Sequence, residues 1–416
     1  MPHANQPSVA GTSRCVPADA PLETFWQTQR DELHDLRSTE ALPEHSDIVI
    51  IGAGYAGVST AYHLVKDFPD VDRSITILEA RGVCSGATGR NGGHARPDLY
   101  GHVPKYIERA GARAGAEVAE FEVANLFALK QIIREEKIDC DFTLARSLDV
   151  WCNEEGAKQA KAIYDQMVEH NFEYMEDVIF YTGDQVEGIC GVKGAKACAS
   201  FTAGTMWPYK FILHLTRLIH AAGVNVQANT PVTSVEPDST GLFCHHTQGK
   251  DPCRQSCLRE QCADGSIIVG GAAAVFRNHE EQWYDNVDDG VLIDSAKDYY
   301  HGYMQRTYRG WEDTGAKVDK IWSGVMGYSY DLHPHIGCVP EAQDQYIIAG
   351  FNGHGMPVIW LSSKELAKMI TMNIPFEKTS MPRLFQTTQA RLDRALNGTV
   401  EDGDVLGGGS PSATKP

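Results

Sequence analysis

The sequence contains no run of about 18 apolar residues, the length that a membrane-spanning helix requires. Basic residues are also in short supply, because 37 Lys and Arg stand against 55 Asp and Glu and give a formal charge of −18. This charge argues against nucleic acids and anionic membrane surfaces as main partners. It does not restrict a small-molecule site, where the local charge can oppose that of the whole chain.

Recognisable sorting signals are lacking as well. Residues 1–15 do not show the basic segment followed by an apolar core that marks a secretory signal, and the ending SATKP is not a peroxisomal tripeptide. The 11 cysteines are odd in number and mostly scattered singly, which fits reduced thiols better than a disulfide framework. We therefore expect a cytoplasmic protein that acts on a small molecule, with no nucleic-acid or membrane partner.

What is present is a β-α-β pattern in residues 47–93. An apolar strand at 48–51 leads into a glycine-rich turn and apolar residues at helical spacing, and a second apolar strand lies at 75–78. The glycines of the turn are Gly52, Gly54 and Gly57. In dinucleotide-binding proteins such glycines permit a tight turn, close approach of the backbone to the pyrophosphate, and close packing of helix on strand.

The residue that follows the second strand is Glu79, about 20 residues after the last glycine, where a ribose-binding acid is expected. A lone Gly-x-Gly-x-x-Gly is a weak signal. Here the preceding strand, the helix, the second strand and the acid all agree. An acid at this place favours an unphosphorylated adenosine ribose, which predicts FAD or NAD rather than NADP.

Two further glycine-rich segments favour FAD over NAD. Residues 85–93, SGATGRNGG, hold four glycines, two hydroxyl residues and one cation, and predict a second anion-binding surface close to Glu79. Residues 350–357, GFNGHGMP, open a helix expected to end near Met372, whose N-terminus presents positive partial charge. From composition alone, a flexible turn and an ordinary strand–turn–helix remain the alternatives.

These motifs resemble the FAD-dependent D-amino-acid oxidase superfamily, and most of all its γ-glutamylputrescine-oxidase-like amine oxidases, which carry a GATGRNGG loop after the ribose acid. The resemblance covers about 47–238 and resumes at about 264–392. It implies that the loop lies along the ribityl and diphosphate parts of FAD, and that the GFNGHGMP end faces the flavin pyrimidine. A covalent flavin link in some relatives uses a cysteine where this chain has Gly324, so the resemblance implies non-covalent FAD.

The resemblance also implies a set of cofactor-contacting residues. They are Gly52, Ala53, Gly54, Tyr55, Ala56, Gly57, Glu79, Ala80, Arg81, Ser85, Gly86, Ala87, Thr88, Gly89, Arg90, Asn91, Gly92, Val232, Gly353, His354, Gly355 and Met356. Candidate residues that face the flavin or the substrate are His94, Trp322 and His354. A purely structural role for these three is the competing interpretation.

Residues 239–263 do not match the family. They hold four cysteines and two histidines, but the cysteine spacings fit no strong zinc template, so no metal site is expected. Family members carry more sequence here, including several strands of the substrate domain. We therefore expect a shortened substrate domain, and with it a second hypothesis, a catalytically impaired or non-catalytic flavin-binding protein.

The expected fold class is α/β (α+β over the whole chain), with a Rossmann-like FAD-binding domain interleaved with a smaller, truncated antiparallel-sheet substrate domain. The FAD-binding domain is expected to comprise residues 47–110, 200–238 and 320–393. The substrate domain is expected to comprise 111–199 and 239–319. A partly disordered arm, 1–46, and a flexible tail, 394–416, flank them.

Four elements are also predicted outside the motifs. Residues 104–136, 279–288 and 295–309 are expected to be helical, and 321–328 to form a strand passing the flavin.

The resemblance implies an oxidoreductase that oxidises a C–N bond of an amine or amino acid to an imine. Hydride passes from the uncharged amine to the flavin, and oxygen reoxidises the flavin to give hydrogen peroxide. No side-chain base is required by this chemistry. A NAD-dependent dehydrogenase is a third hypothesis, which the two additional glycine-rich motifs disfavour.

Overall fold

The computed structural model describes residues 17–237, 242–246 and 266–397. Residues 1–16 of the arm predicted at 1–46, residues 398–416 of the tail predicted at 394–416, and most of the Cys/His-rich segment 239–263 lie outside the described residues.

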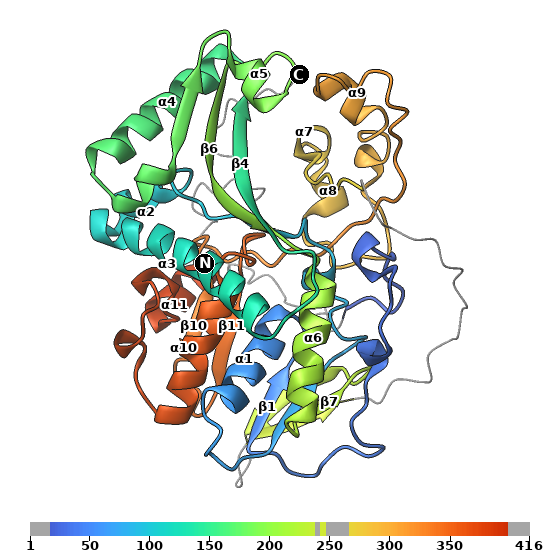
Figure 1. Ribbon diagram of the computed structural model, residues 1–416. Coiled ribbons are helices and arrows are strands. Elements are labelled where there is room, and N and C mark those ends of the chain that lie inside the picture. The colour runs from blue at the N-terminus through green and yellow to red at the C-terminus, as the bar shows by residue number, and fades with distance from the viewer. Residues whose placement is uncertain (1–16, 238–241, 247–265, 398–416) are drawn as a thin grey trace, which may run out of the picture.

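A small parallel sheet carries the first motif. Its strands are β1 (Ile48–Ile51), β2 (Ile75–Leu78) and β7 (Asn225–Gln227), in the order β1-β2-β7. Helices α1 (Tyr55–Lys66) and α6 (Pro208–Ala221) pack against each other beside the sheet (Figure 1). The side chains of β2 are all buried, whereas Val49 and Ile51 of β1 are exposed, so β2 is the central strand of the described sheet.

The turn between β1 and α1 has the geometry that its glycines predict. Gly52 has φ +103°, a conformation that residues with a Cβ rarely adopt. A Cβ on Gly57 would lie 2.0 Å from the carbonyl oxygen of Gly52 and 3.1 Å from Ile50 Cγ2. The absence of a side chain at Gly57 therefore lets α1 start directly against the end of β1.

A second, antiparallel sheet occupies the other half of the molecule (Figure 1). It has the order β3 (His94–Ala95), β6 (Ala197–Thr205) and β4 (Thr143–Trp151), and β5 (Ile179–Thr182) also pairs with β6. The register of β4 on β6 runs from Thr143 opposite Thr205 to Trp151 opposite Ala197. Helix α4 (Glu154–Glu169) lies beside β4. The mixed α/β fold and the two kinds of sheet confirm the predicted fold class.

Two helices, and not one, span the region predicted as a single helix at 104–136. They are α2 (Val103–Ala110) and α3 (Ala112–Glu135), and Gly111, with φ +86°, separates them. At 24 residues α3 is about 36 Å long. Its buried residues join three different hydrophobic clusters, which also contain residues of both sheets and of the C-terminal helices.

The C-terminal part returns to the parallel-sheet half. The hairpin of β10 (His335–Cys338) and β11 (Tyr346–Ala349) precedes α10 (Ile359–Met372), which packs on α1 and α3. The chain then reaches α11 (Gln389–Asn397). The remaining helices and strands are α5 (Val186–Cys190), β8 (Val232–Pro237), β9 (Leu242–His246), α7 (Ala273–Phe276), α8 (Glu280–Trp283) and α9 (Tyr303–Thr307).

Three of the predicted elements are therefore wrong in extent or kind. The helices expected at 279–288 and 295–309 shrink to α8 and α9, because Asp285 and Gly302 take left-handed backbone conformations that interrupt a helix. The strand expected at 321–328 is absent, because these residues pair with no strand of the described residues. Their polar groups bond instead to side chains and turns, which are described with the site.

The N-terminal arm closes over the loop at 85–93. Trp26 is buried against Phe25 and Trp207, and its indole N–H donates to the carbonyl of Asn91 at 2.6 Å. The indole N–H of Trp207 donates in turn to the carbonyl of Trp26 at 2.8 Å. Trp26 thus fixes the arm to the loop through packing and a buried hydrogen bond.

Among the helices of the described residues, none combines the length and the apolar character needed to cross a membrane.

The close contact at Gly57 predicts a large effect of a single methyl group. Gly57→Ala should lower the free energy of unfolding by several kcal/mol, because its Cβ would overlap a backbone oxygen rather than a side chain that can move. Gly188→Ala, in α5, is the matched control. A Cβ there meets nothing within 4 Å, so this change should be neutral or stabilise by about 0.5–1 kcal/mol. Equal denaturant midpoints for the two variants would contradict the predicted overlap.

Candidate functional site

Glu79 lies at the end of β2 and faces the turn that precedes α1. Its Oε2 accepts a hydrogen bond from the backbone N–H of Ala53 at 2.8 Å, and its Oε1 accepts one from the N–H of Arg81 at 2.9 Å. Burial raises the pKa of Glu79, although these backbone N–H groups act in the opposite direction. Further donors, such as ribose hydroxyls, would therefore favour the ionised carboxylate at this place.

The loop at 85–93 contacts the same turn, so the two predicted motifs form one site. The hydroxyl of Thr88 accepts a hydrogen bond from the N–H of Tyr55, the first residue of α1, at 2.9 Å. On the other side of the turn, the N–H of Cys84 donates to the carbonyl of Ala53 at 3.0 Å. One of the free N–H groups at the start of α1 is thus already capped from within the chain.

Arg90, the cation of this loop, is buried and holds together segments that are distant in sequence. It donates to the carbonyls of Leu22, Asp289 and Ser323 at 2.7–3.0 Å, and its Nε lies 3.3 Å from the Asp289 carboxylate. Arg81 binds the same carboxylate with two nearly parallel hydrogen bonds of 2.9 and 3.0 Å. Asp289 is therefore a buried anion shared by two arginines.

Two buried donors in the loop are left without a partner. Ser85 Oγ and Arg90 Nη1 are buried and have no hydrogen-bond partner among the described residues. Beside Gly52 and Gly86 the space is open, because a Cβ at either position would meet nothing within 4 Å. Unsatisfied donors, open space beside glycines and a helix N-terminus are what a bound diphosphate requires, so the residues fit a dinucleotide here.

The GFNGHGMP segment at 350–357, called the second motif below, is held in place by helix α3. His354 Nε2 lies 2.9 Å from Oε2 of Glu122. Asn125, which is fully buried, donates to the carbonyl of Met356 and accepts from the N–H of Leu361 at 2.8 Å. Because α10 begins only at Ile359, residues 353–356 form a turn before the helix rather than its first residues.

The segment at 322–329 connects the two motifs. The indole N–H of Trp322 donates to the carbonyl of Arg90 at 2.9 Å, and Arg90 Nε donates to the carbonyl of Ser323 at 2.8 Å. At the other end, the N–H of Asn352 donates to the carbonyl of Gly327 at 3.0 Å. These bonds replace the strand pairing expected at 321–328.

The remaining candidate residues are spread around this core. Val232 begins β8 two residues after Thr230, whose N–H donates to the carbonyl of Glu79 at 2.7 Å. His94 lies on β3 with an exposed side chain, opposite Thr205 of β6. Desolvation of the imidazole and the neighbouring Arg96 lower the pKa of His94. The part of the structure that is described shows no hydrogen bond between His94 and the other two flavin-facing candidates, Trp322 and His354.

Sequence reasoning missed Glu122, Asn125 and Asp289. Glu122 and Asn125 are spaced i, i+3 and share the buried side of α3 with Leu126 and Leu129. A carboxylate and an amide within an apolar helical stripe are a signal that the sequence offers. Asp289 lies in a polar loop, and nothing local distinguishes it from its neighbours.

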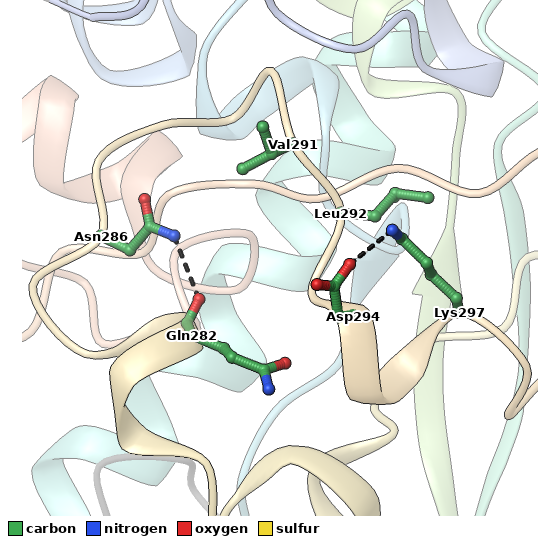
Figure 2. A pocket seen from close by; sticks show the side chains of 6 residues that line it. All are labelled: Gln282, Asn286, Val291, Leu292, Asp294 and Lys297. Atoms are coloured by element: carbon green, nitrogen blue, oxygen red, sulfur yellow. Dashed lines mark hydrogen bonds and ion pairs between the residues drawn. The ribbon is translucent and has the colours of Figure 1, made fainter.

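A cavity of about 510 Å³ lies between residues 282 and 297 (Figure 2). Its lining residues are Gln282, Asn286, Val291, Leu292, Asp294 and Lys297. Asn286 donates to the carbonyl of Gln282 at 3.0 Å, and Asp294 pairs with Lys297. The side-chain oxygen of Gln282 accepts from Ser295, and none of the predicted cofactor-contacting residues lines the cavity.

The family model described as DAO, FAD dependent oxidoreductase, matches residues 47–258 and 251–369, which include both glycine-rich motifs and Glu79. The chain belongs to this family. It is therefore an FAD-dependent oxidoreductase, and the cofactor predicted from Glu79 and the loop at 85–93 is confirmed.

Two relatives of known sequence span most of the chain. Gamma-glutamylputrescine oxidoreductase of Escherichia coli (strain K12) is 34% identical over 380 residues, which are 78% of this chain and 83% of that protein. The probable oxidoreductase OrdL of Haemophilus influenzae is 28% identical over 379 residues, 79% of this chain and 83% of that protein.

Solved structures share the fold at low sequence identity. L-Proline dehydrogenase from P. horikoshii gives a TM-score of 0.55 at 17% identity, with 80% of this chain and 96% of that chain covered. Glycine oxidase from Geobacillus kaustophilus gives 0.57 at 16%, with the same coverage. The expectation of a shortened substrate domain is therefore corrected. Because 96% of each of these two chains is covered, no truncation relative to them is evident.

The contacts of Glu79 predict its effect on cofactor binding. Glu79→Ala should weaken FAD binding about 10- to 100-fold, because a hydrogen bond to a charged group contributes about 1.5–3 kcal/mol. Fluorescence titration of the apoprotein with FAD measures this change, and Glu40→Ala, at an exposed position, is the control.

The Glu79→Ala substitution should also change how FAD affinity depends on pH. Because ribose hydroxyls favour the carboxylate, FAD affinity should fall as pH drops through the raised pKa of Glu79. Glu79→Ala should abolish this acid-side decrease. An unaltered pH profile in the variant would show that another group is responsible.

The shared carboxylate of Asp289 predicts a large stability effect. Asp289→Asn should lower the free energy of unfolding by about 3 kcal/mol, because it leaves the buried Arg90 without its counter-ion. Asp285→Asn, at an exposed position where Asn tolerates the positive φ, should change stability by less than about 0.5 kcal/mol. A small effect of Asp289→Asn in urea unfolding would indicate that the carboxylate does not neutralise the arginines.

Proposed function

We propose that the chain is an amine or amino-acid oxidase, which removes a hydride from the carbon next to the substrate nitrogen and so converts a C–N bond to C=N. The observation that carries the proposal is the 34% identity to gamma-glutamylputrescine oxidoreductase over 83% of that protein. The candidate site supports it, because segment 322–329 hydrogen-bonds to both FAD motifs and so brings them to one place.

In this proposal the chain's own residues bind and orient. Glu79 accepts the ribose hydroxyls, while the start of α1, Ser85 and Arg90 Nη1 supply donors for the diphosphate. The turn at Gly353, Gly355 and Met356 faces the flavin end, where Trp322 and His354 border the substrate. FAD, when bound, supplies the acceptor for hydride from the amine, and oxygen regenerates it with release of hydrogen peroxide.

The rest of the cofactor assignment belongs to the same proposal. The backbone of Ala53, Gly54, Ala56 and Gly57 approaches the pyrophosphate, and Ala80 with Val232 borders the adenine side. The loop at 85–93 follows the ribityl chain. Gly324 offers no thiol, so the flavin is held non-covalently. A cytoplasmic location is proposed with it, and cell fractionation tests that part.

Spectroscopy of the purified protein tests the cofactor part. We expect a yellow protein with the two visible bands of oxidised flavin, and release of all flavin into the supernatant after acid precipitation. Flavin that stays with the precipitate would contradict non-covalent binding. A colourless protein that binds no added FAD would contradict the cofactor assignment for this chain.

Substrate oxidation is tested with the same preparation. A panel of diamines, N-acylated diamines, glycine, proline and D- and L-amino acids is assayed for hydrogen peroxide and for bleaching of the flavin without oxygen. We expect a response to at least one amine class. Bleaching without peroxide would indicate a dehydrogenase, and flavin that no panel member bleaches would support the alternative of a catalytically impaired protein.

A further inference from the structure

Helix α3 carries a buried carboxylate whose counter-ion comes from the second motif. The Glu122 side chain is 3% exposed, whereas that of His354 is 39% exposed. Oε2 of Glu122 accepts from the backbone N–H of Asp98 at 2.7 Å and lies 2.9 Å from His354 Nε2. A buried carboxylate is costly unless it is hydrogen-bonded and neutralised, and the imidazole meets both needs only when it carries a proton on Nε2 and a positive charge.

The exposed fractions of the two side chains show which partner lies nearer the solvent. Glu122 is the inner partner and His354 the outer one, so a charged pair has its positive end toward the open side of the turn at 353–356. This turn precedes α10, whose N-terminus adds positive partial charge on the same side.

Other charged groups around His354 do not cancel this arrangement. Asp98, bonded through its N–H to Glu122, also attracts a cation, while Arg96 repels one. His102, which pairs with Asp98, competes with His354 because the two imidazoles repel each other when both are charged. Partial burial opposes protonation, but Glu122 and Asp98 outweigh it and raise the pKa of His354.

We propose that Glu122 is a positioning residue, which orients the imidazole of His354 and keeps it as the doubly protonated cation at the turn before α10. In the oxidase proposed above, on which this consequence rests, that cation stabilises negative charge on the reduced cofactor. Without Glu122 the same position holds a neutral imidazole, and the flavin becomes harder to reduce.

The direct test is an NMR titration of His354 in the protein before FAD is added, with the signal assigned through His354→Gln. The pKa of His354 should lie above that of an unfolded histidine, and Glu122→Gln should lower it by about one unit or more, a tenfold loss of proton affinity. Glu120→Gln, on the same helix but paired with Arg113 at the surface, should leave it unchanged. A pKa below the unfolded value in the unmodified protein would overturn the proposal, even if Glu122→Gln does not fold.

The pH dependence of the free energy of unfolding is a second test, and the proposal predicts its sign. Because the folded pKa of His354 is raised, the pair stabilises the fold fully below the unfolded histidine pKa and loses this contribution as pH rises through the folded value. The stability difference between wild type and Glu122→Gln should thus shrink from mildly acidic to alkaline pH. A difference independent of pH would mean that Glu122 acts only through packing.

The reduction potential of the bound flavin distinguishes failure of this proposal from failure of the proposed function. In protein loaded with FAD, Glu122→Gln should make the flavin reduction potential more negative than in Glu120→Gln. Absence of bound flavin would defeat the oxidase proposal but leave the His354 titration valid. An unchanged potential together with a lowered pKa would overturn the electrostatic role proposed for the pair.

Discussion

The constraint on which the site depends is that polar groups buried on α3 must find partners. Glu122 and Asn125 lie on the side of the helix that packs into the core, where an unpaired carboxylate or amide is costly. Their partners are His354, the carbonyl of Met356 and the N–H of Leu361. Because α3 also contributes to three hydrophobic clusters, the turn before α10 is fixed relative to both halves of the molecule.

A similar principle governs the first motif. The buried carboxylate of Asp289 accepts hydrogen bonds from Arg81 and lies against Arg90, and the arginines also bond to backbone carbonyls from the arm, the loop and segment 322–323. None of these segments belongs to the strand ladders of the described sheets. Charged hydrogen bonds from two arginines therefore hold these segments together, as backbone hydrogen bonds between strands do elsewhere in the fold.

The Arg81–Arg90–Asp289 cluster and the Glu122–His354 pair differ in their free polar groups and in their charge. In the loop at 85–93, Nη1 of Arg90 has no hydrogen-bond partner among the described residues, while the other guanidinium nitrogens are held by backbone carbonyls. At the turn of residues 353–356, Glu122 lies 2.9 Å from the His354 imidazole and raises its pKa. In the proposed function the first group, Arg90, would serve binding of the diphosphate, and the second, His354, would tune the flavin.

The sequence by itself determined the β-α-β unit, the position of Glu79 and the FAD family, because glycine spacing, helical periodicity and a terminal acid are local features. It also predicted the helix that follows residues 350–357 and ends near Met372, which is α10. The tertiary structure alone decided that 321–328 is not a strand, and it alone revealed the Asp289 cluster and the Glu122–His354 pair. The last two residues are 232 positions apart, and only packing of α3 against the turn before α10 makes them neighbours.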